Sequence, residues 1–171
     1  MRLVADDHAT VLPHEVEQWT AGGTSYLWVR VPTVAGGGAT TRVWLYYGNP
    51  NASDAQDAAA LWNGHRAVWH LTGLTDASGQ GHTGTNQGTL DAAGKIGRAR
   101  RSGDARIQVT HAATLSFSAT DSFTLSAWAS VETLRARWQG VVTKSRDAAP
   151  WYGLWLSKSN AWVAGGPANI T

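Results

Sequence analysis

The stretch Ser25-Tyr-Leu-Trp-Val-Arg-Val31 indicates the fold class, because its side chains alternate with a period of two. Leu27, Val29 and Val31 fall on one face of such a segment, and Trp28 falls on the other. This alternation is typical of a half-buried β-strand and does not fit the 3.6-residue period of a helix. The stretch therefore predicts a strand with one aliphatic face.

Similar short apolar runs recur along the chain and are separated by Gly, Pro and Asn turn signals. The further strands expected from these runs cover residues 11–19, 41–47, 67–71, 106–109, 123–129, 140–143, 152–156 and 161–163. One short connecting helix is expected near residues 53–62, where Ser53 and Gln56 form a capping box. Many short strands with almost no helix predict an all-β fold, an antiparallel β-sandwich.

Composition excludes several classes of protein. The 171 residues carry a formal charge of +2, which is weak attraction for nucleic acid, so no nucleic-acid partner is expected. The absence of cysteine excludes disulfides, zinc–thiolate sites and a thiol nucleophile. No apolar stretch approaches the ~20 residues that cross a bilayer, so no membrane span is expected. Ten tryptophans are many for this length, and such rings either fill cores or form binding surfaces.

The first part of the chain, residues 1–63, carries a family resemblance in the runs Leu12–Trp19, Leu27–Pro32 and Val43–Pro50. These runs resemble the C-terminal half of a bacterial domain of unknown function. That domain is found in secreted and surface proteins and in some MotA/TolQ/ExbB-type proton-channel proteins. The resemblance implies a partial β domain at residues 1–63, without its front half.

The second part, residues 64–171, resembles a laminin-G-like, concanavalin-A-type jelly roll. The matching runs are Val68–Leu71, Asp76–Gly84, Phe123–Trp128, Trp138–Lys144 and Tyr152–Leu156. The resemblance implies a jelly-roll β-sandwich that ends before its last strands. Together the two resemblances imply an internal fragment of a longer bacterial protein that is extracellular or on the cell surface, with no signal peptide in this fragment.

Catalytic motifs are weak, and the chain is not expected to be an enzyme. Glycosidases need two carboxylates across a cleft, and Glu15 and Glu17 lie two residues apart on one strand face. They fall in the first part, however, and the second part lacks the Glu-x-Asp-x-Glu strand of concanavalin-A-type glycosidases. The chain also has no Gly-x-Ser-x-Gly elbow for a serine nucleophile.

Calcium is the one cofactor that the sequence suggests. The loop that begins at Asp76 offers a carboxylate, the Ser78 hydroxyl and free carbonyls, which are the oxygen ligands that calcium prefers. Laminin-G-like domains often bind calcium, and the resemblance implies that Asp76 and Ser78 contribute. The alternative is a glycine-rich turn in which Asp76 accepts hydrogen bonds from its own backbone.

The tryptophans suggest the ligand. Trp138 and Trp151 lie beside loops, near Gln139 and Asp147, and an exposed ring beside amide and charged groups suits sugar recognition. The alternative is that each ring packs under a loop. Trp28 and Trp44 both lie opposite the aliphatic face of their strands, so one of them is expected to face solvent.

The expected function is therefore a non-catalytic carbohydrate-binding or adhesion module. Its partner would be a polysaccharide or surface glycan, with a protein partner as a further possibility. The alternative is a structural spacer or protein–protein interaction β-sandwich without a small ligand, in which the tryptophans are core residues.

Overall fold

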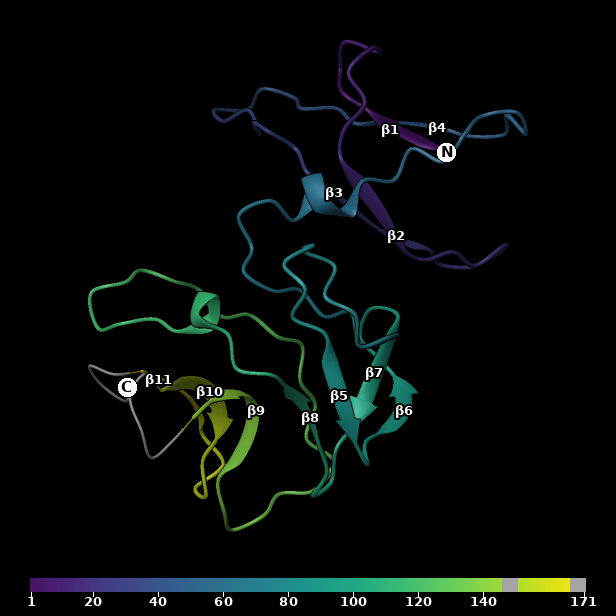
Figure 1. Cartoon of the computed structure of the whole chain (residues 1–171). Helices are drawn as coiled ribbons and strands as arrows, with labels where there is room; N and C mark the ends of the chain where they lie inside the picture. The colour runs from purple at the N-terminus through teal and green to yellow at the C-terminus, as the bar shows by residue number, and fades with distance from the viewer. Residues whose placement is uncertain (146–150, 167–171) are drawn as a thin grey trace. The chain divides into compact units, whose positions relative to one another are not determined.

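The computed structural model describes residues 1–145 and 151–166 (Figure 1). The chain divides into two compact units, residues 1–110 and 111–171. Strands dominate both units, and every strand pairing among the described residues is antiparallel. The predicted all-β class is confirmed.

The elements are short. The first unit contains β1 (Arg2–Val4), β2 (His14–Gln18), β3 (Tyr26–Val29), β4 (Trp44–Tyr46), helix α1 (Ala58–Leu61), β5 (Gly84–Gln87), β6 (Leu90–Ala93), β7 (Arg98–Arg101) and β8 (Arg106–Val109). The second unit contains a 3₁₀ turn (Ala113–Leu115), β9 (Gln139–Lys144), β10 (Tyr152–Leu156) and β11 (Trp162–Gly165).

Among the described residues, the first unit is built from four strand pairs, and the second from one three-stranded sheet. The pairs are β1 with β4, β2 with β3, β5 with β8, and β6 with β7. In the second unit β10 lies between β9 and β11, as Figure 1 shows for the yellow-green strands. Two-stranded ribbons bury little apolar surface by themselves, so contacts between side chains of different ribbons matter for this fold.

Strand β2 is interrupted by a bulge. Val16 lies opposite Leu27 and Gln18 lies opposite Tyr26, so Glu17 is an extra residue without a partner on β3. A bulge bends its strand and redirects a side chain. Here it marks the position of Glu17, whose side chain is almost completely buried.

Each unit has its own small core. The buried apolar side chains of the first unit are Leu3, Val4, Leu12 and Leu61, and His14 is fully buried, with its Nδ1 2.8 Å from the Leu12 carbonyl oxygen. In the second unit Tyr152 is buried against Phe117 and Phe123, whose rings stack with centroids 4.4 Å apart. The Tyr152 hydroxyl donates to the Leu115 carbonyl at 2.8 Å, and burial raises the pKa of this phenol.

Four sequence expectations were wrong in detail. Residues 67–71 and 123–129 form no strand, and Trp128 is largely exposed. The helix is one turn long, and its N-cap is Asp57, which accepts a hydrogen bond from Ala60 N–H at 2.9 Å. Ser53 is not the cap, because the Gln56 side chain accepts from Val16 N–H instead of closing a capping box.

Strands β5 and β6 lie inside the glycine-rich stretch of residues 72–97, which carries too little apolar alternation to reveal them. The predicted domain boundary at residues 63 and 64 and the jelly-roll arrangement of residues 64–171 stay predictions.

Candidate functional site

An exposed group of rings lies on β4, and we call Asp6, His8, Arg42, Trp44 and Tyr46 the aromatic surface. Trp44 and Tyr46 are two residues apart in one strand, so they share a face of the β1–β4 ribbon. The His8 imidazole lies against Trp44 with centroids 4.5 Å apart, and its Nδ1 is 2.8 Å from the Tyr46 hydroxyl. The three rings thus form one continuous exposed patch.

The loop between β1 and Leu12 holds His8 in place. The Asp7 carboxylate accepts hydrogen bonds from the Thr10 hydroxyl at 2.6 Å and from the backbone N–H groups of Thr10 and Ala9. The Thr10 hydroxyl and these backbone donors lower the pKa of Asp7 to about 2. His8 has φ of 58°, a left-handed conformation that side chains other than glycine rarely adopt. The hydrogen bonds of this loop therefore hold the His8 backbone in a strained conformation, in which the imidazole ring contacts Trp44.

Charged groups border these rings. The Trp44 indole N–H is 3.4 Å from an oxygen of Asp6, and an Arg42 guanidinium nitrogen is 3.8 Å from the other oxygen. Both charged side chains are more than half exposed, so the ion pair contributes little to stability. Arg42 and Asp6 therefore place a hydrogen-bond donor and a hydrogen-bond acceptor beside the exposed aromatic rings.

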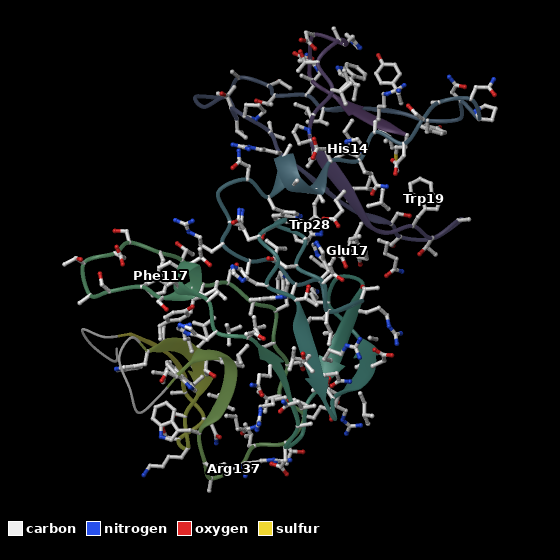
Figure 2. The ribbon with its side chains drawn as sticks, in the orientation of Figure 1. His14, Glu17, Trp19, Trp28, Phe117 and Arg137 are labelled. Carbon is white, nitrogen blue, oxygen red and sulfur yellow. The ribbon has the colours of Figure 1, made fainter. Side chains whose placement is uncertain are left out.

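A second cluster, the clasp, consists of Glu15, Glu17, Trp28, Trp62 and His70. His70 lies between the two carboxylates, with Nε2 3.0 Å from Glu15 and Nδ1 2.5 Å from Glu17. The indole N–H of Trp62 donates to Glu15 and that of Trp28 donates to Glu17, both at 2.8 Å; Figure 2 shows Trp28 beside Glu17. An ionised carboxylate only accepts hydrogen bonds, so this arrangement is satisfied when both nitrogens of His70 carry hydrogens.

The turn between β6 and β7 packs against the clasp. A Cβ atom on Gly97 would lie 2.8 Å from Oε1 of Glu17, and Gly97 has φ of +59°. Two shallow clefts, of about 360 and 340 Å³, adjoin the cluster, and Glu17 and Thr72 line both. The Oε2 atoms of both glutamates are already paired within the clasp, which favours a structural role for it.

The Asp76 loop is the predicted calcium position. The structure brings Asp76 and Ser78 together, but it directs four hydrogen bonds at the Asp76 carboxylate: from the Ser78 hydroxyl and from the N–H groups of Val68, Ser78 and His82, at 2.7–3.0 Å. Burial raises the pKa of Asp76, but the hydrogen bonds from Ser78, Val68 and His82 outweigh it and lower that pKa overall. A calcium ion would have to displace some of these donors.

The residues predicted to bind carbohydrate do not lie together. Trp138 precedes β9 and Trp151 precedes β10, and in this antiparallel pair Gln139 lies opposite Leu156 whereas Lys144 lies opposite Tyr152. The two tryptophans therefore lie at opposite ends of the strand pair, roughly 20 Å apart along it at ~3.3 Å per residue.

The other members of this predicted set differ in their surroundings. The amide oxygen of Gln139 is buried and has no hydrogen-bond partner among the described residues. The Trp151 ring contacts Trp155, with centroids 6.1 Å apart. Asp147 lies outside the described residues.

The described part of the chain shows neither a metal-binding cluster nor a membrane-spanning helix. Residues 1–145 and 151–166 contain no group of three or more His, Asp or Glu side chains arranged to hold a metal ion. No helix in these ranges has the length and apolar character to cross a membrane.

Sequence reasoning missed most of the aromatic surface and the clasp. Of Trp28 and Trp44, one was expected to face solvent, and Trp44 does. Glu15 and Glu17 were noted as a pair on one strand face, but His70 lies 55 residues beyond Glu15. No local pattern joins residues so distant in the chain.

Comparison with known proteins finds a family match for part of the chain. The model of a domain of unknown function (DUF2341) matches residues 1–69. No curated protein matches the chain, and no solved structure matches it. The whole aromatic surface lies within the matched residues, and His70 of the clasp directly follows them.

Proposed function

We propose that this protein is a non-catalytic carbohydrate-binding or adhesion module of a bacterial extracellular or surface protein, and that the aromatic surface is its binding site. The observation that carries this proposal is the exposed pair Trp44 and Tyr46, with His8 against them and Asp6 and Arg42 at the rim. The position differs from Trp138 and Trp151, because those two rings lie at opposite ends of a strand pair.

The chemistry of a sugar fits this arrangement. A pyranose ring presents apolar C–H faces, which stack on flat aromatic rings, and a rim of hydroxyls, which need donors and acceptors. Trp44 and Tyr46 supply the flat apolar area. Arg42 supplies donors and Asp6 supplies acceptors, and both remain exposed enough to exchange their long mutual contact for sugar hydroxyls.

Contacts within the protein also hold this arrangement in place without a ligand. The Asp7 hydrogen bonds hold the loop that carries His8, and the strand pairing of Val4 with Trp44 fixes the base of the ribbon. A site ordered in advance loses less conformational entropy on binding, which favours affinity.

The alternative is a spacer or protein–protein interaction domain. The clasp supports it in part, because two of the ten tryptophans serve there as hydrogen-bond donors inside the fold. A spacer, however, gives no reason for a strained His8 beside two exposed rings. We therefore favour glycan binding over the spacer.

Two further parts of the proposal rest on family resemblance. A laminin-G-like jelly roll over residues 64–171 and a relation of residues 1–63 to domains of surface and MotA/TolQ/ExbB-type proteins would both suit an extracellular or surface location. Calcium binding at Asp76 and Ser78 is implied by the laminin-G-like resemblance. The ion would bind only by replacing hydrogen bonds of the loop, so we expect weak calcium affinity.

Affinity electrophoresis through gels containing soluble polysaccharides tests the proposal. At least one polysaccharide should retard the protein, and Trp44→Ala should remove most of the retardation. Trp162→Ala is the control, because Trp162 is also an exposed strand tryptophan, in the second unit. Equal loss in both variants would contradict the aromatic surface as the binding site, and no retardation by any polysaccharide in the panel would favour the spacer.

A further inference from the structure

Strand β4 has an open edge. Among the residues that the structure describes, its one hydrogen-bonded neighbour is β1. An open strand edge presents backbone N–H and C=O groups that can pair with another strand. Proteins usually protect such edges with charges, prolines or bulges.

This edge lacks that protection. No charged residue occurs between Arg42 and Asp54. The strand and its flanking residues are exposed on both faces of the ribbon: Val43 36%, Trp44 39%, Leu45 42%, Tyr46 48% and Tyr47 78%. Five consecutive exposed apolar or aromatic residues form a patch of the kind that marks an interaction site.

We propose that a second copy of this chain pairs with β4 along this edge, antiparallel, with Leu45 opposite Leu45 of the second copy. In this register Trp44 lies opposite Tyr46 of the second copy, and Val43 lies opposite Tyr47. Aromatic–aromatic and aromatic–β-branched pairs are the favourable cross-strand combinations. The segment is therefore complementary to itself under a two-fold axis, as an isologous dimer requires.

Neighbouring symmetric registers are poorer. Centring the axis on Trp44 places Arg42 opposite Tyr46 and leaves Tyr47 opposite Thr41. Centring it on Tyr46 places Trp44 opposite Gly48, which offers no side chain. The register centred on Leu45 keeps all five apolar residues paired and brings no like charges opposite each other.

The exposed area sets an upper limit on the dimer interface. At ~150–250 Å² for each aromatic side chain, the exposed fractions of Trp44, Tyr46 and Tyr47 amount to roughly 300 Å² on each copy. With Val43 and Leu45 the two copies together expose roughly 800–1,000 Å², and edge pairing covers only part of this area, so the interface belongs to the small, weak class. We expect dissociation in the micromolar range or above.

The dimer would form a four-stranded sheet in the order β1–β4–β4–β1. Pairing along the edge leaves the faces of the sheet open, so Trp44 and Tyr46 of both copies would line one face. This inference does not depend on the proposed function, because the strand pairing needs no glycan. It would nevertheless double the aromatic area that a polysaccharide meets.

Sedimentation equilibrium of the full chain without glycan is the first test. The average mass should rise with concentration from 18.2 kDa toward twice that value. Tyr47→Lys should raise the dissociation constant about tenfold or more, because a charge replaces an apolar pair. Val34→Lys, at an exposed position outside the strand, should not change it. A mass of 18.2 kDa at all concentrations, or equal effects of both variants, would overturn the proposal.

A cysteine variant tests the register. The chain has no cysteine, so Leu45→Cys introduces a single thiol. Residues directly opposite in antiparallel strands have Cα atoms ~4.5–5.5 Å apart, which permits a disulfide. Leu45→Cys should form disulfide-linked dimers much faster than Val34→Cys under mild oxidation. Equal rates would overturn the pairing at Leu45, even if the protein dimerises elsewhere.

Discussion

Nδ1 of His70 lies 2.5 Å from Oε2 of Glu17, and this contact joins strand β2 to a residue more than fifty positions later in the chain. The same carboxylate accepts from Trp28, and Gly97 packs against its other oxygen. The family match ends at residue 69, yet the contacts of the clasp continue into the β6–β7 turn. Residues beyond the matched segment therefore help to hold it.

Removal of His70 should destabilise the first unit. In His70→Ala the two carboxylates of the clasp lose their shared partner and each keeps only an indole N–H donor, which should lower the free energy of unfolding by about 2 kcal/mol. Urea denaturation followed by tryptophan fluorescence measures this change. Arg66→Ala, at a nearby exposed position, should have almost no effect; equal stability of the two variants would contradict the structural role of the clasp.

Gly97 and Gly103 form a matched pair for testing the contact with Glu17. Both have positive φ, +59° and +55°, so alanine introduces similar backbone strain of about 1 kcal/mol at each. A Cβ on Gly97 meets the Glu17 carboxylate at 2.8 Å, whereas one on Gly103 meets nothing within 4 Å. Gly97→Ala should therefore cost about 1 kcal/mol more in denaturation experiments. Equal losses would mean that Glu17 is not fixed in position.

Asp76 should make stability depend on acid pH. Its folded pKa lies below the ordinary 3.8, so its contribution is present above that value and is lost as the pH falls through the folded pKa. Asp76→Asn, which retains the shape but loses the charge, should lower the free energy of unfolding by about 1–2 kcal/mol near neutral pH.

The difference between Asp76→Asn and the wild type should then shrink at acid pH. Thermal melts from neutral pH down to acid measure it. A difference that does not change with pH would show that the Asp76 charge does not stabilise the loop.

Asp7 should titrate far below an ordinary aspartate. Its pKa is about 2 because the Thr10 hydroxyl and two backbone N–H groups stabilise the charged form. Thr10→Val removes the largest of these effects and should move the pKa back toward 3.8. The carboxyl carbon resonance of Asp7 reports this titration directly. If the wild type titrates near 3.8, the loop that presents His8 is not ordered as described.

The sequence predicted the strands with clear alternation and missed those without it. Leu27, Val29 and Leu45 belong to apolar runs bounded by turn residues, and they fall in or beside the strands expected there. In contrast, β5 and β6 contain mainly polar or small residues, and their position depends on partners β8 and β7. Whether such segments form strands depends on their contacts with the rest of the fold.

The candidate site was only partly accessible from the sequence. The alternation around Trp44 indicated that its ring could face solvent, but the approach of His8 depends on a left-handed backbone that no local pattern specifies. Trp138 and Trp151 seemed suitable because both lie beside loops. Only the strand register, with Gln139 opposite Leu156, shows that they lie at opposite ends.

The indole N–H resonances of the ten tryptophans test the central claim most directly. During titration with a polysaccharide that retards the protein, the indole resonance of Trp44 should shift in a saturable way, while those of Trp28 and Trp62 in the clasp stay in place. The same titration of Trp44→Ala should shift no indole resonance. Shifts confined to Trp138 and Trp151, with Trp44 unchanged, would contradict the aromatic surface as the binding site.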